Sequence, residues 1–197
     1  HGASGVASTL LDFSVIDPDD RPLRDLAIEA ISYEDELFDP VKQNWPDLRQ
    51  YSTWNAVRLL TPPFQVAWCH GAGGIALARQ QAFKITGDET YSESVFSAAE
   101  TLRASLVGQS KKDLSLCHGA PGNLEILRLL DWISGESVHS IGNEEIEREV
   151  FGELGSVIRQ FSAHKHDPGL MLGLSGCAIG MLNQFRGGGF SRLIPRA

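Results

Sequence analysis

Two Cys-His pairs are the residues of this sequence whose types and spacing best suit chemistry. Cys69 precedes His70, and Cys117 precedes His118. Cysteine thiolate and histidine imidazole are common zinc ligands, and two Cys with one His would leave the fourth tetrahedral position open, as in catalytic sites. The competing interpretation is structural, because a free cysteine is often a small buried core residue. The pattern alone supports zinc binding and core packing about equally.

Both pairs belong to a repeated glycine motif. His-Gly-x-x-Gly begins at His1, His70 and His118, and a fourth copy keeps the glycines with Leu172 in place of the histidine. The glycines are Gly2 and Gly5, Gly71 and Gly74, Gly119 and Gly122, and Gly173 and Gly176. Their first members are 69, 48 and 54 residues apart, which accommodates two helices and two loops per repeat. Because the glycines occur in every copy and Cys-His in only two, we interpret the glycines as scaffold and Cys-His as functional.

The segments around the glycines predict helices of two kinds. Apolar, helix-compatible segments follow the glycine pairs, and amphipathic segments lie between them. The apolar segments include 75–82, 124–133 and 178–185, and the amphipathic ones are 23–38, 88–106, with Asp88 as its expected cap, and 144–162. Inner and outer helices in alternation predict an all-α fold, part of an α/α toroid with at least four repeats. In such a ring the residues beside the glycines converge on one central opening.

Composition narrows the functional classes. The net charge of −8 argues against nucleic acid as a partner, and no apolar run reaches the roughly 20 residues of a transmembrane helix. Three cysteines without a secretion signal favour a reducing compartment, so we expect a cytoplasmic protein. The third, Cys177, lacks a neighbouring histidine and is expected to pack in the core. The first residue is not methionine, so we expect the sequence to begin inside a longer protein.

Several motifs together resemble those of a known enzyme family. The segments 68–75 (WCHGAGGI), 116–123 (LCHGAPGN) and 168–176 (PGLMLGLSG) resemble the signatures of LanC-like lanthionine cyclases. The segments 33–39 (YEDELFD) and 44–48 (NWPDL) resemble the corresponding part of LanM-type (class II) lanthipeptide synthetases. The resemblance implies that residues 1–197 are the C-terminal part of one cyclase domain. Earlier repeats and an N-terminal dehydratase domain are then expected upstream in the full-length chain.

The resemblance also implies a ligand set and a catalytic residue. Cys69, Cys117 and His118 match the family's zinc ligands, and His1 matches its catalytic histidine. We expect His70, Trp68 and Asn123 to lie behind the ligands or to face the substrate. Stand-alone cyclases carry an arginine four residues before the first cysteine, where this chain has Gln65. An acidic residue that orients the catalytic histidine in the family would lie upstream of His1.

The implied reaction is a thiol addition to a dehydroamino acid. A zinc-activated cysteine thiolate of a dehydrated precursor peptide attacks the β-carbon of dehydroalanine or dehydrobutyrine, and His1 protonates the α-carbon or, alternatively, acts as base toward the thiol. Two other functions remain open on sequence grounds. A related enzyme could add glutathione or another small thiol, or the chain could be a non-catalytic zinc-containing peptide-binding domain. We expect the fragment alone to be inactive.

Overall fold

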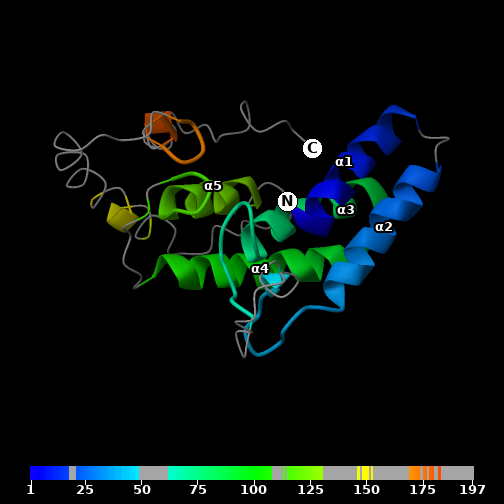
Figure 1. Cartoon of the computed structure of the whole chain (residues 1–197), viewed down its shortest axis with the longest axis horizontal. Helices are drawn as coiled ribbons and strands as arrows, with labels where there is room; N and C mark the ends of the chain where they lie inside the picture. Colours follow the sequence, from blue (N-terminus) through cyan, green and yellow to red (C-terminus); the bar gives the residue numbers. More distant parts are fainter. Residues whose placement is uncertain are drawn as a thin grey trace, which may run out of the picture. The chain divides into compact units, whose positions relative to one another are not determined.

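The computed structural model describes five helices. It covers residues 1–17, 21–48, 62–107, 113, 115–130, 146, 148–150, 152, 169–173, 175, 176, 178, 179 and 182. The helices are α1 (Gly2–Ile16), α2 (Arg21–Asp35), α3 (Ala72–Thr86), α4 (Glu89–Leu106) and α5 (Ala120–Leu130) (Figure 1). The described residues contain no strand, and two isolated β-bridges join Asp39 to Asn44 and Val66 to Gly71. In this part of the chain the predicted all-helical class is confirmed.

The chain divides into two compact units, which are described separately. The first comprises His1–Thr101 and the second Leu102–Arg196, so that the boundary falls within α4. None of the described helices has the length and apolar character that crossing a membrane would require.

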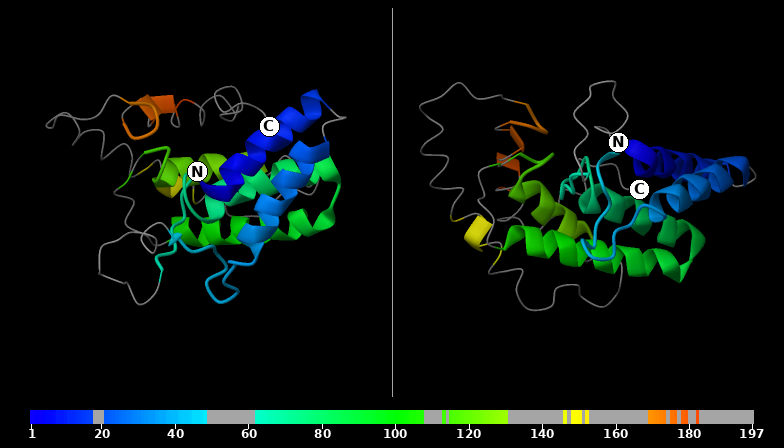
Figure 2. Two further views of the ribbon diagram at one scale, coloured as in Figure 1. Left: turned by 45° about the vertical axis from the view of Figure 1, so that its right-hand side comes forward. Right: turned by 60° about the horizontal axis from the view of Figure 1, so that its bottom comes forward.

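In the first unit, α1 contacts both α2 and α3 (Figures 1 and 2). The helix α1 turns a stripe of Ala7, Leu11 and Ser14 inward, at the spacing that places residues on one helix face. A small hydrophobic core forms around this stripe. Its buried members are Ala7, Leu11, Ala27, Ile31, Ala82 and Tyr91.

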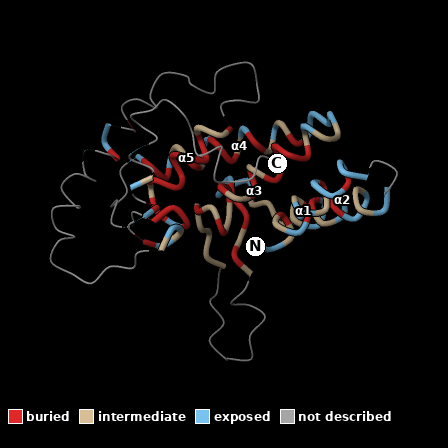
Figure 3. Tube along the Cα trace, turned by 90° about the horizontal axis from the view of Figure 1, so that it is seen from above, coloured by how far each residue is buried: buried red, intermediate tan, exposed pale blue. Residues whose placement is uncertain are grey.

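The helices α3 and α4 differ in burial as the sequence predicts for inner and outer helices (Figure 3). Most of α3 is buried, including its polar residues Arg79, Gln80 and Gln81. Along α4, Val95, Ala98, Ala99 and Leu102 are buried, whereas Phe96 is exposed. The helix α3 ends at Thr86 and is capped by Gly87, whose φ of 72° is a left-handed conformation that glycine adopts without strain.

The helix boundaries agree with the predicted segments to within a few residues. The Asp88 carboxylate accepts bonds from the backbone N–H and hydroxyl of Thr90, which confirms it as the cap of α4. The predicted segment 23–38 ends earlier, because α2 stops at Asp35 and residues 36–38 continue as a turn. Segment 124–133 is contained in α5 as far as Leu130. Most of 144–162 and 178–185 lies outside the described residues, as does Cys177.

Candidate metal centre

In the first unit, Cys69 lies in a tight turn that leads into α3. The β-bridge between Val66 and Gly71 closes the turn, and the Ala67 N–H donates to the His70 carbonyl at 3.0 Å. Gly71 has a φ of +75°, and a Cβ atom there would lie 1.8 Å from the Gln65 carbonyl oxygen. The close backbone approach therefore excludes any side chain at position 71. Cys69 itself is buried.

In the second unit, Cys117 lies in a similar turn that leads into α5. The His118 N–H donates to Ser115 Oγ at 3.1 Å, and the Gly119 N–H donates to the Ser115 carbonyl at 3.0 Å. A Cβ at Gly119 would lie 2.3 Å from the Asp113 carbonyl oxygen. Cys117 is buried, whereas His118 is exposed. The Cys117 Sγ lies 3.9 Å from His118 Nε2, so both donor atoms are on the same side of the turn.

The second glycine of each described turn also meets a backbone carbonyl. A Cβ at Gly74, Gly122 or Gly176 would lie 2.2, 1.9 or 2.0 Å from the carbonyl oxygen of the residue six positions earlier. The first copy is different, because a Cβ at Gly5 would meet no atom within 4 Å and one at Gly2 would reach only Glu34 Oε1 at 4.0 Å. Gly2 nevertheless has a φ of +66°, which disfavours other residues.

The fourth glycine copy joins the Cys117 turn within the second unit. The Cys117 N–H donates to the Met171 carbonyl at 2.9 Å, and the Gly173 N–H donates to the Gly169 carbonyl at 3.0 Å. The fourth glycine turn, which has no Cys-His pair, therefore hydrogen-bonds to the turn that carries Cys117 and His118.

The two histidines of the first unit lie together. His1, at the N-cap of α1, stacks on His70 with ring centroids 5.5 Å apart and an interplanar angle of 15°. His1 is exposed, and His70 and Trp68 are half-buried. His1 and His70 are 69 positions apart in the chain. Their stacking brings His1 beside the Cys69 turn.

Asn123 connects two helices of the second unit. It lies inside α5 and is buried, and its Nδ2 donates to Ser105 Oγ at 3.4 Å. This bond gives Asn123 a role in holding α5 against the last turn of α4.

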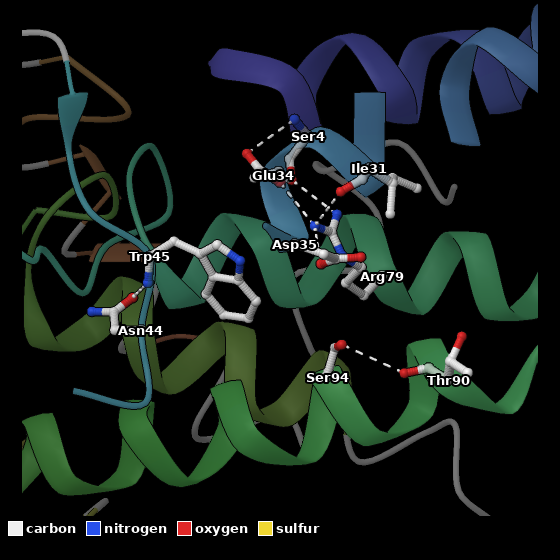
Figure 4. Close-up of polar contacts among 9 residues, drawn as sticks. All are labelled: Ser4, Ile31, Glu34, Asp35, Asn44, Trp45, Arg79, Thr90 and Ser94. Atoms are coloured by element: carbon white, nitrogen blue, oxygen red, sulfur yellow. Dashed lines mark hydrogen bonds and ion pairs between the residues drawn. The ribbon is translucent and has the colours of Figure 1, made fainter. Parts of the chain in front are cut away.

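A buried arginine that sequence analysis did not single out organises the start of α1. Arg79, fully buried on α3, pairs with Asp35 at 2.8 Å and with Glu34 at 3.1 Å (Figure 4). Glu34 in turn accepts the Ser4 hydroxyl and the Ser4 N–H. Because His1 provides no side-chain cap, the carboxylate of Glu34 performs that function from α2. The sequence signal was a charged residue in the middle of a predicted inner helix.

The loop before the Cys69 turn supplies a second set of polar contacts. Asn44 is buried and its side chain bonds to Gln65, Trp45 and Ala72, while Gln65 Nε2 donates to Asp47 Oδ2 at 3.2 Å. Position 65 therefore carries a carboxamide that is hydrogen-bonded to an acidic side chain. Asn44 and Asp47 belong to a segment that the sequence marked as a motif without assigning it a role.

Glycine turns that present Cys and His at the start of inner helices define an all-helical repeat protein with a candidate metal centre. The sequence model of the family described as "Lanthionine synthetase C-like protein" matches residues 1–193. The chain belongs to this family.

Curated relatives and a solved structure are consistent with this membership. The chain is 32% identical over 123 residues to "Glutathione S-transferase LANCL1" of Danio rerio, covering 62% of this chain and 27% of the relative. It is 24% identical over 197 residues to "Lacticin 481/lactococcin biosynthesis protein LcnDR2" of Lactococcus lactis subsp. lactis, covering 94% of this chain and 20% of the relative. The chain thus spans less than a third of the length of either relative.

The structure of "Nisin cyclase" superposes with a TM-score of 0.63 at 18% identity, covering 98% of this chain and 47% of that one. At this identity the similarity establishes the fold alone. This similarity confirms the predicted α/α toroid class.

Proposed function

We propose that this chain is the zinc-binding part of a lanthionine cyclase, with Cys69, Cys117 and His118 as ligands of one zinc ion. The observation that carries the proposal is the equivalence of two turns. Cys69 and Cys117 are both buried cysteines in glycine-closed turns that lead directly into inner helices, α3 and α5. Family membership over residues 1–193 supports the same assignment.

The donor set fits zinc. Two thiolates and an imidazole, each offering one ligand atom, are a known ligand set of catalytic zinc. With Zn–S near 2.3 Å and Zn–N near 2.0 Å, tetrahedral ligands should lie roughly 3.5 Å apart. The 3.9 Å between Cys117 Sγ and His118 Nε2 is close to that separation. When bound, zinc would lower the pKa of a substrate thiol and provide thiolate near neutral pH.

In this proposal, a residue of this chain transfers the proton that the addition requires. The C–S bond forms at the β-carbon of a dehydroalanine or dehydrobutyrine, the alkene electrons move to the carbonyl as an enolate, and the α-carbon takes up a proton. His1 is exposed at the N-cap of α1, and imidazole exchanges protons near neutral pH. His1 delivers that proton in this proposal, and a base role toward the incoming thiol is its alternative. His70, stacked on His1, limits the rotation of the imidazole.

The substrate proposed is a dehydrated precursor peptide. The relative named for lacticin 481 biosynthesis aligns with 94% of this chain, and the resemblance to LanM-type synthetases implies a dehydratase domain in the same full-length polypeptide. The proposal also places the enzyme in the cytoplasm, because its thiol ligands need a reducing compartment.

A second candidate substrate is glutathione or another small thiol. The observation that favours it is the 32% identity to a relative named as a glutathione S-transferase. The bond-forming chemistry would be the same, and only the thiol donor would differ.

Mass spectrometry distinguishes these substrates. The complete enzyme with zinc is incubated with a dehydrated precursor peptide, with and without glutathione, and remaining thiols are then alkylated. Peptide cyclisation appears as loss of alkylation sites without a mass gain, whereas glutathione addition adds the mass of the tripeptide. If zinc is bound but neither product forms, the cyclase proposal is wrong and a peptide-binding role remains.

A further inference from the structure

Asn44 lies at the base of the turn that carries Cys69. The residue is 2% exposed, and its side chain makes three hydrogen bonds. Its Oδ1 accepts the N–H of Trp45 at 2.8 Å and the N–H of Ala72 at 2.9 Å. Its Nδ2 donates to the Gln65 carbonyl at 3.0 Å. Figure 4 shows the bond to Trp45.

Two of these bonds hold opposite ends of one turn. Gln65 lies before the β-bridge of Val66 and Gly71, and Ala72 is the first residue of α3. The segment between them contains Cys69 and His70. The amide of Asn44 therefore joins the entry and the exit of this turn from a third segment of chain, while the absence of a side chain at position 71 allows the backbones to approach.

Only a carboxamide satisfies all three contacts. The oxygen must accept two N–H groups and the nitrogen must donate to a carbonyl. An aspartate of the same shape would keep the acceptor but place a negative oxygen against the Gln65 carbonyl. In a site this buried, the resulting unmatched pair of acceptors is costly.

We propose that Asn44 is a positioning residue that fixes the Cys69 turn and thereby presents the Cys69 sulfur to zinc. The inference rests on the proposed role of Cys69 as a zinc ligand and deepens it. Residues that orient the ligands of a metal site commonly change its affinity by about 10- to 100-fold when they are replaced. Asn44 acts in this way on a cysteine through its backbone.

The alternative is that Asn44 only stabilises its own loop, and a second anchor of that loop provides a matched control. Thr101 Oγ1 donates to the Gln43 carbonyl at 2.6 Å, one residue before Asn44 and outside the Cys69 turn. Thr101→Val removes that hydroxyl with little change in shape. A purely structural loop contact should behave like this control.

The test compares native full-length protein with Asn44→Asp and Thr101→Val. Zinc affinity is measured by competition with a colorimetric chelator, and the alkylation rates of Cys69 and Cys117 are measured by peptide mapping of metal-free protein. We expect Asn44→Asp to weaken zinc binding about tenfold or more and to accelerate alkylation of Cys69 but not of Cys117. Thr101→Val should change neither quantity. Asn44→Ser, which lacks the added charge, serves if the aspartate variant does not fold.

The outcomes separate this inference from the proposed function. Unchanged zinc affinity in both Asn44 variants, or equal acceleration at Cys69 and Cys117, overturns the positioning role. If native protein binds no zinc, the ligand assignment fails. The alkylation rate of Cys69 relative to that of Cys117 then still shows whether Asn44 holds the Cys69 turn. If zinc binds but no peptide cyclises, only the cyclase activity is rejected.

Discussion

At the scale of single residues, the two histidines of the first unit have different surroundings. His1 is exposed at the end of a helix, whereas His70 is half-buried and adjacent to Cys69. An exposed imidazole can reach a substrate atom, and a half-buried one beside a metal ligand is better placed to support its neighbour. This contrast agrees with the proposal, made from the family resemblance, that His1 rather than His70 transfers the proton.

Replacing His1 tests that assignment. His1→Asn should reduce the cyclisation rate by about 10²- to 10⁴-fold, the usual contribution of a general acid or base, while zinc content is unchanged. His70→Phe keeps an aromatic ring for stacking and should reduce the rate by less than about tenfold. Rates are measured by mass spectrometry on the full-length enzyme. A larger loss in His70→Phe than in His1→Asn would reverse the assignment.

At the scale of elements, Arg79 links three helices. It lies on α3, bonds to the two carboxylates at the end of α2, and lies 3.4 Å from the Ser4 hydroxyl on α1. Glu34 is shielded, with 13% of its side chain exposed, whereas 41% of Asp35 is exposed. Of the two ion pairs that Arg79 makes, the pair with Glu34 is therefore less screened by solvent.

Removing the charge of Arg79 should loosen these helices. Arg79→Met leaves the shielded Glu34 carboxylate without its cation, which we expect to cost about 3 kcal/mol. Amides of α1, α2 and α3 should then exchange hydrogen roughly a hundredfold faster, as measured by mass spectrometry. Asp35→Asn is the matched control and should have a much smaller effect, because that carboxylate is substantially exposed. Equal effects of the two variants would contradict this account of the network.

The cap of α4 is expected to depend on pH. The hydroxyl and N–H of Thr90 bond to Asp88 and hold the pKa of its carboxyl below the ordinary 3.8. A lowered carboxyl pKa stabilises the folded protein above the unfolded value and loses that contribution as pH falls through the folded value. Protection of the first-turn amides of α4 should therefore decrease below pH 3.8, and Asp88→Asn should remove the dependence. Native protein with unchanged protection across this range would disprove the capping role.

The glycine pattern made much of the helical architecture predictable. Glycines that cannot carry a Cβ, followed by apolar residues, placed α3 and α5 at the correct positions in the chain. The contacts of Asn44 and Arg79 were not predictable in this way. Apart from the bond between Asn44 and its neighbour Trp45, they join residues 21 to 75 positions apart and depend on how separate segments pack, which residue spacing does not encode.

The placement of the site residues shows the same limit. The adjacent pair Cys117 and His118 could be anticipated because one turn fixes both. The stacking of His1 on His70 was foreseen only in general terms, through the equivalence of repeats, since it depends on the orientation of α1 beside the Cys69 turn.

At the scale of the whole molecule, the chain matches part of a larger solved structure. It covers 47% of the nisin cyclase chain to which its fold is similar. The helix α1 exposes the large apolar residues Val6, Phe13, Val15 and Ile16.

The central claim is that Cys69 and Cys117 bind the same zinc ion, and metal analysis of the purified full-length protein tests it most directly. Native protein should contain about one zinc ion per cyclase domain, and Cys69→Ala and Cys117→Ala should each lose it. Cys177→Ala, which changes the cysteine outside the proposed ligand set, should retain it. Stoichiometric zinc in either the Cys69 or the Cys117 variant would contradict the account.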